Sequence, residues 1–314
     1  MKSSKYSGFP GPFSICNDAV FKAIFTKETP ESKAALRSLL SAFLERELSV
    51  LEVTANEPPI NDLQDRQIRF DISVRFNDGE LADVEMTVHP RHYEALRFEY
   101  YTARLFVEQH IRGKDRTYRD LRPTYHLSFL AANLYPDREW LHRFIYYDPE
   151  HAVKMGGRTE ILTVELKKLG GITGKTVEQM SVKERWALFM VYYRERVDKK
   201  TGILQKIIRM DDGIAAADHV IRGFTETELG RIAARARDKF EFDAREELWE
   251  MKEAAREEGR AEGRAEGRAE GLMEGRSEGS DTQKNMARKL KDLGIPLDQI
   301  IEVSGLPAGV IESL

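Results

Sequence analysis

Apolar and polar residues alternate along two neighbouring stretches of the chain, residues 70–76 and 82–89. The apolar positions are Phe70, Ile72, Val74 and Phe76 in the first stretch, and Ala82, Val84, Met86 and Val88 in the second. A period of two predicts two β-strands, each with one face in the core and one polar face. Between them, Asn77-Asp78-Gly79 suits a three-residue hairpin loop with Gly79 in a left-handed conformation.

The length of this loop decides which residues face each other across the hairpin. A three-residue loop pairs Phe76 with Glu80, and it then sets Asp71 opposite Glu85 on the polar face. A two-residue turn would shift the pairing by one residue and set Asp71 against Met86. Because the apolar residues of both strands must share the buried face, we favour the three-residue loop.

Two carboxylates that face each other across a hairpin have a specific chemical use. Their Cβ atoms lie about 4.5–5.5 Å apart, and like charges in this position destabilise a sheet. A divalent metal ion such as Mg²⁺, with its oxygen ligands at about 2.0–2.1 Å, converts the repulsion between Asp71 and Glu85 into coordination. The alternative is an ordinary solvated face of an amphipathic hairpin, on which acidic residues are common.

The remaining pattern predicts helices on both sides of a sheet. We expect helices at residues 17–25, 31–47, 90–113 and 181–196, with helical character that continues to about residue 253. Asn17 suits the N-cap of the first helix. Shorter alternating stretches predict strands at residues 124–131, 143–147 and 161–166. This order indicates an α/β fold in which a mixed sheet is flanked by helices.

The helix at residues 90–113 follows the hairpin directly and has its own apolar stripe. The residues expected on its buried face are Tyr93, Leu96, Tyr100, Ala103 and Val107. Arg97 and Arg104 are seven residues apart and share one side of this helix.

The composition changes at Gly259, where Glu-Gly-Arg-Ala repeats begin. Glycine recurs every four residues, at Gly259, Gly263, Gly267, Gly271, Gly275 and Gly279. In one helix the i,i+4 neighbours would be Arg–Arg and Glu–Glu pairs, which repel. Six glycines also cost about 5–6 kcal/mol relative to alanine, so the segment should not form a stable helix alone. Pairing with a second copy, through complementary Arg and Glu stripes, is one hypothesis; a charged flexible linker is the other.

The last residues recover a helical pattern. Helices are expected at residues 283–293, 297–303 and 307–314, in the outline of a helix-turn-helix. The final helix has no Lys or Arg with which to contact DNA bases. We therefore favour a small docking module over a module that reads DNA sequence. The predicted division is a main domain at 1–255, with its core at 15–170 and a helical part at 175–255, then the repeat at 256–280 and this module at 281–314.

Composition excludes some classes of function. The net charge of −4 gives no overall attraction to nucleic acid, so DNA binding would need a local basic surface. Cys16 is the only cysteine, which fits a reducing compartment. No apolar run has the length of a membrane span, and the first residues lack the apolar stretch of a secretory signal. We expect a cytoplasmic protein with no membrane partner.

Several segments, in their order along the chain, resemble one family. These segments are the helix Asp18 to Phe25, Phe70-Asp71-Ile72, Val84-Glu85-Met86, Arg97 to Tyr101, residues 113–118, residues 160–167, the helix around Trp186, the Gly-Arg repeats and the final Leu-Gly-Ile-Pro. The chain is similar to the Rpn family of recombination-promoting nucleases, also named transposases, in the PD-(D/E)xK nuclease superfamily. The resemblance covers nearly the whole chain.

The resemblance implies a restriction-endonuclease-like core, a mixed sheet with helices on both faces, and Mg²⁺-dependent hydrolysis of DNA phosphodiester bonds. Asp71 and Glu85 match the two metal-binding acids, and Mn²⁺ is an alternative ion. The position two residues after the Glu orients or activates water; it is Lys in the superfamily and usually Gln in this family. Here it is Thr87, a departure that falls in the active site.

Three further residues are candidates for accessory roles. Asp18 falls where the superfamily often adds another acid. Lys22, on the same predicted helix, is a substitute for the missing Lys or Gln, or else a solvated helix residue. His89 shares the polar face of the hairpin and is either an additional site residue or a structural strand-end histidine.

DNA contact is expected from the arginine-rich segment that follows the hairpin, with Arg91, Arg97 and Arg104 as the candidates. The leading hypothesis is a metal-dependent DNA endonuclease linked to recombination, a hydrolase with no small-molecule substrate. Thr87 keeps a second hypothesis open, in which an impaired nuclease fold binds DNA or protein without cutting. A third, compatible with both, is a homo-oligomeric scaffold built through the Gly-Arg repeat.

Overall fold

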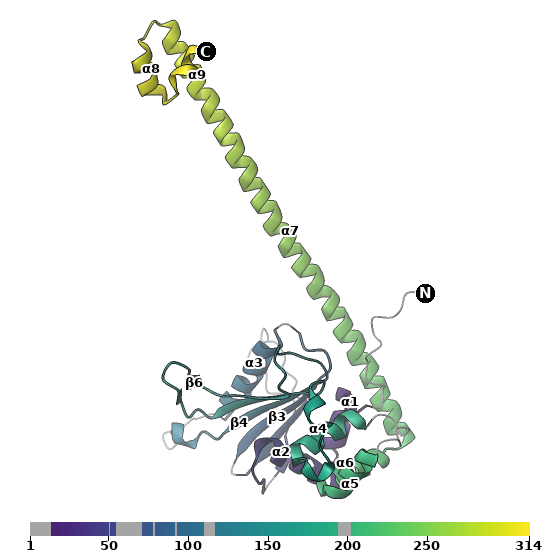
Figure 1. Ribbon diagram of the computed structural model, residues 1–314. Helices are drawn as coiled ribbons and strands as arrows, with labels where there is room; N and C mark the ends of the chain where they lie inside the picture. The colour runs from purple at the N-terminus through teal and green to yellow at the C-terminus, as the bar shows by residue number, and fades with distance from the viewer. Residues whose placement is uncertain are drawn as a thin grey trace. The chain divides into compact units, whose positions relative to one another are not determined.

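The computed structural model describes residues 14–49, 51–54, 71–77, 79–91, 93–109, 117–193 and 202–314, apart from some side chains in α7. Phe70 and Asp78 of the predicted hairpin lie outside the described residues, as do Gly113 and the end of the helix predicted at 181–196. The chain divides into two compact units, Met1–Lys239 and Phe240–Leu314 (Figure 1).

The predicted hairpin is present in the predicted register. Strand β2 (Ile72–Phe76) runs antiparallel to β3 (Glu80–Thr87), with Phe76 paired to Glu80 and Ile72 to Val84. Gly79 in the connecting loop has φ of +94°, as the three-residue loop requires. One further step of this register sets Asp71, the residue before β2, opposite Glu85.

The hairpin belongs to a six-stranded mixed sheet with the order β1-β2-β3-β4-β8-β5. The other four strands are β1 (Leu51–Val53), β4 (Thr124–Leu130), β5 (Leu141–Phe144) and β8 (Thr159–Glu165). The β3–β4 and β4–β8 pairs are parallel, and the other pairs are antiparallel. Strands β6 (Tyr147–Asp148) and β7 (Val153–Lys154) form a separate small hairpin. The predicted mixed sheet is confirmed.

Helix α3 (Glu94–Val107) connects β3 to the parallel strand β4 and lies on one face of the sheet (Figure 1). Its predicted buried stripe is wrong: Leu96, Tyr100 and Val107 are 67%, 47% and 59% exposed. The residues on its buried side are Glu94, Phe98, Thr102 and Leu105. The reason is that α3 covers the polar face of the sheet, so its buried side carries a carboxylate and a hydroxyl. The helix also begins later than Pro90, with Tyr93 at the N-cap.

On the opposite side of the sheet lie helices from both ends of the first unit (Figure 1). These helices are α1 (Asp18–Phe25), α2 (Pro30–Leu44), α4 (Val182–Tyr192), α5 (Gly202–Met210) and α6 (Asp212–Arg222). Among them, α6 packs on α2, and α5 packs on α4 and α6. Asn17 is the N-cap of α1, where its side chain accepts a hydrogen bond from the Ala19 N–H at 3.0 Å, as predicted.

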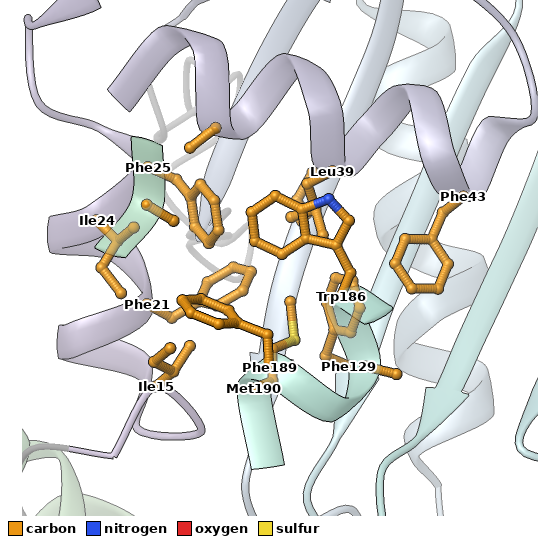
Figure 2. Packing of buried hydrophobic residues seen from close by; sticks show 14 of the residues in the cluster. Ile15, Phe21, Ile24, Phe25, Leu39, Phe43, Phe129, Trp186, Phe189 and Met190 are labelled. Atoms are coloured by element: carbon orange, nitrogen blue, oxygen red, sulfur yellow. The ribbon is translucent and has the colours of Figure 1, made fainter. Parts of the chain in front are cut away.

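Aromatic side chains fill the core between these helices and the sheet (Figure 2). Phe129 of β4 packs against Phe21 of α1 and Phe43 of α2, with ring centroids 5.8 and 5.1 Å apart. Trp186 of α4 is fully buried 6.0 Å from Phe25, and its indole N–H donates to Ser38 Oγ at 3.1 Å. The core therefore fixes α1 against the sheet by several large rings.

The second unit contains most of α7 (Glu226–Asp292) and two short helices, α8 (Leu297–Ser304) and α9 (Ala308–Glu312). A small core of Ala287, Ile300 and Ile311 joins the end of α7 to α8 and α9. Among the described helices, the 67-residue α7 included, none is both long and apolar enough to cross a membrane.

The whole Glu-Gly-Arg-Ala repeat lies within α7. This differs from a flexible linker, which was one of the two interpretations of the sequence. At each of the six repeat glycines a Cβ atom would meet open space. No neighbouring side chain of the described residues therefore packs there to compensate for the lower helix stability of glycine relative to alanine. The free energy cost of these glycines, about 5–6 kcal/mol, is therefore not offset within the described part of one chain.

We predict that Trp186→Ala lowers the free energy of unfolding of the first unit by about 3–5 kcal/mol, because it opens a cavity beside Phe25 and removes the Ser38 hydrogen bond. Urea denaturation followed by far-UV circular dichroism measures this change. Trp249→Ala is the matched control, since that side chain is 65% exposed on α7. Equal destabilisation by the two substitutions would contradict the prediction.

Candidate active site

Polar side chains gather on the face of the sheet that α3 covers. The parallel register sets Asp83 of β3 beside His126 of β4, and Glu85 beside Ser128. All four side chains are buried. The apolar residues that alternate with them belong to the core on the opposite face. The sheet thus has one apolar face and, at its centre, one polar face that is also removed from water.

Asp71 lies at the start of this polar face, beside the first helix. Its Oδ2 accepts a hydrogen bond from the Met86 N–H at 3.2 Å, and its Oδ1 lies 2.9 Å from the Lys22 ammonium. Lys22 also lies 3.9 Å from Asp18 Oδ1, one helical turn earlier in α1. Three residues singled out from the sequence, Asp71, Lys22 and Asp18, are therefore neighbours.

Glu85 is held from the side of α3 by Arg97. The Arg97 Nη2 atom lies 3.0 Å from Glu85 Oε1, and the same nitrogen donates to Thr87 Oγ1 at 3.2 Å. Its Nε donates to Oε1 of the buried Glu94 at 2.5 Å. Burial alone lowers the pKa of the guanidinium, but the Glu85 and Glu94 carboxylates outweigh that effect and raise the pKa above its usual range. Arg97 is thus a permanent cation.

Asp83 and His126 extend the cluster into the sheet. His126 Nδ1 lies 3.0 Å from Asp83 Oδ2, and His126 Nε2 lies 3.8 Å from Glu85 Oε2. Burial raises the pKa of Asp83, and the facing imidazole opposes part of that rise. Ligand atoms of Asp83, Glu85 and His126 lie within 4.8 Å of one another, a grouping that can hold a metal ion.

The acidic residues at this site can supply ligands for a cation. The described residues here include the buried side chains of Asp71, Asp83, Glu85 and Glu94. Lys22 contacts Asp71, and Arg97 contacts Glu85 and Glu94. Carboxylate oxygens are the ligands that Mg²⁺ prefers, and an imidazole nitrogen suits transition metals such as Mn²⁺. The residues present therefore fit a divalent ion.

The other candidates from the sequence lie around this cluster. His89 is exposed just beyond the end of β3. The Arg91 guanidinium donates to the Tyr93 hydroxyl at 2.6 Å. Arg104 is half-buried on α3 and acts electrostatically on Glu108, whose pKa is raised by burial and lowered in part by this arginine. Roles in catalysis or DNA binding for these three remain predictions.

Asp83 and His126 were missed in the sequence, although a signal for each was there. Asp83 shares the period-two phase of Asp71 and Glu85 and so belongs to the same face. His126 alternates with the apolar residues Tyr125, Leu127 and Phe129 of its own strand, so it belongs to the polar face of the sheet. The order of the strands in the sheet was not predictable, because no local feature of the sequence indicates that β4 lies next to β3.

A comparison with protein families identifies this architecture. A family model described as PD-(D/E)XK nuclease family transposase matches residues 15–250. The chain belongs to this family, which confirms the resemblance and the fold class predicted from the sequence. Searches of curated proteins and of solved structures gave no significant match.

We predict that Arg97→Gln lowers the free energy of unfolding by about 3 kcal/mol, because it removes a cation that contacts the buried Glu94 and Glu85 carboxylates. The double variant Arg97→Gln, Glu94→Gln should recover part of this loss, since one of the buried charges is then gone. Urea denaturation measures both changes. Arg119→Gln, at an exposed position, is the control and should change stability by less than about 0.5 kcal/mol.

The role assigned to Arg97 is contradicted if Arg97→Gln is as stable as Arg119→Gln. It is also contradicted if the Glu94 substitution adds a further loss, because the carboxylate would then be stabilising without its arginine.

Proposed function

We propose that this member of the family is a metal-dependent endonuclease that hydrolyses DNA phosphodiester bonds, with Asp71 and Glu85 as the ligands of Mg²⁺ or Mn²⁺. The observation that carries the proposal is the register of the hairpin, which sets the two acids opposite each other on a buried polar face. Membership of a nuclease family adds the reaction class.

A bound divalent ion would activate water and offset negative charge on the scissile phosphate in the transition state. The chain's own residues prepare for this. Lys22 holds one oxygen of Asp71, and the Met86 N–H holds the other. Arg97 holds one oxygen of Glu85. These contacts orient the two carboxylates before an ion binds.

Thr87 stands where the superfamily has Lys and the family usually has Gln. Its hydroxyl accepts a hydrogen bond from Arg97 and can also donate one, so it retains the capacity to hold a water molecule. The positive charge that a lysine would supply is supplied beside Thr87 by the Arg97 guanidinium, and by Lys22 on the side of Asp71. This arrangement supports an active site that functions without the usual third residue.

The second candidate function is a nuclease fold that binds DNA or protein without cleaving it. One observation favours it: Thr87 has a shorter side chain than Gln or Lys and is buried under Arg97. For the nuclease, and for the DNA-binding form of the second candidate, the proposed DNA contacts are Arg91, Arg104 and neighbouring basic residues. A role in recombination and a cytoplasmic location belong to the same proposal.

We predict that the full-length protein converts supercoiled plasmid to nicked or linear DNA in Mg²⁺ or Mn²⁺, and that Asp71→Asn and Glu85→Gln each reduce the rate at least about 100-fold. Both substitutions preserve side-chain shape and remove a metal-binding charge. Gel analysis of plasmid cleavage measures the rates. Glu150→Gln, an exposed acid between β6 and β7, is the control and should cleave at the wild-type rate.

Thr87→Gln distinguishes the two candidate functions. If the natural chain cleaves DNA, this variant should change the rate by less than about tenfold, because Arg97 already supplies the charge beside this position. If the natural chain is inactive with both ions and Thr87→Gln gains cleavage, the nuclease proposal is rejected and the binding function replaces it.

Self-association through the Gly-Arg repeat is the remaining part of the proposal. The repeat is helical in α7, and its six glycines leave open space along the helix. A second copy can fill that space, and attraction between opposed Arg and Glu stripes then offsets the repulsion that remains within each helix. Glycine and alanine at the contact allow the two backbones to approach closely.

We predict that deletion of residues 259–279 lowers the molar mass of the full chain in solution, measured by size-exclusion chromatography with light scattering. The matched control replaces these residues by a scrambled segment of the same length and composition, in which glycine no longer recurs every four residues. The scrambled chain should also have the lower mass, because the stripes are lost. Equal mass for the natural and scrambled chains would rule out pairing by the repeat.

A further inference from the structure

His126 is a buried histidine that bridges two carboxylates. Its Nδ1 faces Asp83 Oδ2 at 3.0 Å, and its Nε2 faces Glu85 Oε2 at 3.8 Å. The ring packs against Phe98 of α3, with centroids 4.9 Å apart. Asp83 and His126 are both fully buried. The imidazole is therefore fixed between Asp83 on one side and the proposed metal ligand Glu85 on the other.

This bridge is not required by the fold. A position in the middle of β4 that faces a helix is suited to Val or Ile, which would remove a buried polar group from the sheet. Within the described part of the chain, neither nitrogen of His126 and neither oxygen of Asp83 makes a hydrogen bond of good geometry. Such a pair costs free energy that an apolar pair would not. Its presence next to Glu85 indicates a function in the site.

Two roles are open to His126. As a ligand it would bind the ion through Nε2 while Nδ1 faced a carboxylate, which is the usual arrangement of a metal-binding histidine. As a support it would fix the position of Glu85 by contact, with Arg97 at Oε1 and the His126 ring 3.8 Å from Oε2, a distance longer than a hydrogen bond. The contact of Nε2 with Glu85 favours the support, and nitrogen hyperfine coupling to bound Mn²⁺ separates the two roles.

We propose that His126, backed by Asp83, is a positioning residue that holds the Glu85 carboxylate in its metal-binding orientation. The proposal rests on the proposed function, because it assumes that Glu85 binds the ion. It goes beyond that function by assigning a role to two residues outside the acid pair and the third motif position. The Arg97 guanidinium at one oxygen and the buried His126 ring beside the other restrict the rotation of the Glu85 carboxylate before the ion arrives.

The test is direct metal binding by the full-length protein without DNA, with Mg²⁺ followed by calorimetry and Mn²⁺ by electron paramagnetic resonance. His126→Phe keeps the ring and its packing on Phe98 but removes both nitrogens. We expect it to weaken metal binding about 10–100-fold. His126→Gln should recover part of the affinity, since an amide can still donate to Glu85.

The control is His142→Phe. His142 lies on the same sheet face, opposite Thr163 of β8, and its ring nitrogens contact Asp137 and Glu165 instead of Glu85. Its loss should change metal affinity by less than about twofold. Asp83→Asn should weaken binding as well, and adding it to His126→Phe should cause no further loss, because Asp83 acts through His126.

Cleavage kinetics give an independent measurement. His126→Phe should raise the metal concentration for half-maximal activity, while the rate at saturating metal returns to within about tenfold of the wild type. Substitution of a residue that only supports the fold would lower thermal stability. It would not raise the metal requirement while leaving the rate at saturating metal nearly unchanged.

Four outcomes would overturn the proposal. If the natural chain binds neither ion, the proposed function and the positioning role fail together. If the natural chain binds metal and folded His126→Phe binds it equally well, the positioning role fails alone. If His126→Phe does not fold, His126→Gln and Asp83→Asn are measured instead. Wild-type metal affinity in both of these variants then overturns the positioning role. Nitrogen hyperfine coupling to bound Mn²⁺ that disappears in His126→Phe would make His126 a ligand instead.

Discussion

The interaction on which the site depends is the one between Arg97 and the carboxylates beneath it. Glu85 and Glu94 are buried, and one guanidinium contacts both while it also donates to Thr87. Buried carboxylates without a cation would be strongly destabilising, so α3 must present Arg97 toward the sheet. That requirement sets the rotation of α3 about its own axis, and it explains why Leu96, Tyr100 and Val107 are on the outside. Electrostatics at the centre of the sheet outweighs the burial of three apolar side chains.

The two faces of the sheet therefore have different tasks. On one face, Phe21, Phe43, Phe129 and Trp186 provide stability through close packing with α1, α2 and α4. On the other, polar residues are kept out of water, at a cost in free energy that the aromatic core offsets. Helix α1 links the two, because Phe21 packs into the core while Lys22, the next residue, contacts Asp71. A rigid core thus positions the cation that holds one of the two proposed metal ligands.

How far the sequence predicted this site depends on the range of the interactions. The hairpin register was predictable because a loop type and a shared apolar face are local features, and they placed Asp71 against Glu85. The resemblance added the fold class and the family. The contacts of Arg97 and His126 were not predictable, because they depend on strand order and on the rotation of α3, which long-range pairing decides. Helical periodicity failed at α3 because that rule assumes that the covered surface is apolar.

The departure at Thr87 has a different meaning once its surroundings are known. A lysine at this position would bring an ammonium beside Glu85, in direct competition with the guanidinium that already lies 3.0 Å from that carboxylate. With threonine, Arg97 approaches both residues at once and satisfies the hydroxyl. The positive charge beside Glu85 therefore comes from α3 and not from β3. Compared with the glutamine that is usual in the family, Thr87 is a shorter polar residue whose hydroxyl is bound by that same guanidinium, so its environment cannot be understood without Arg97.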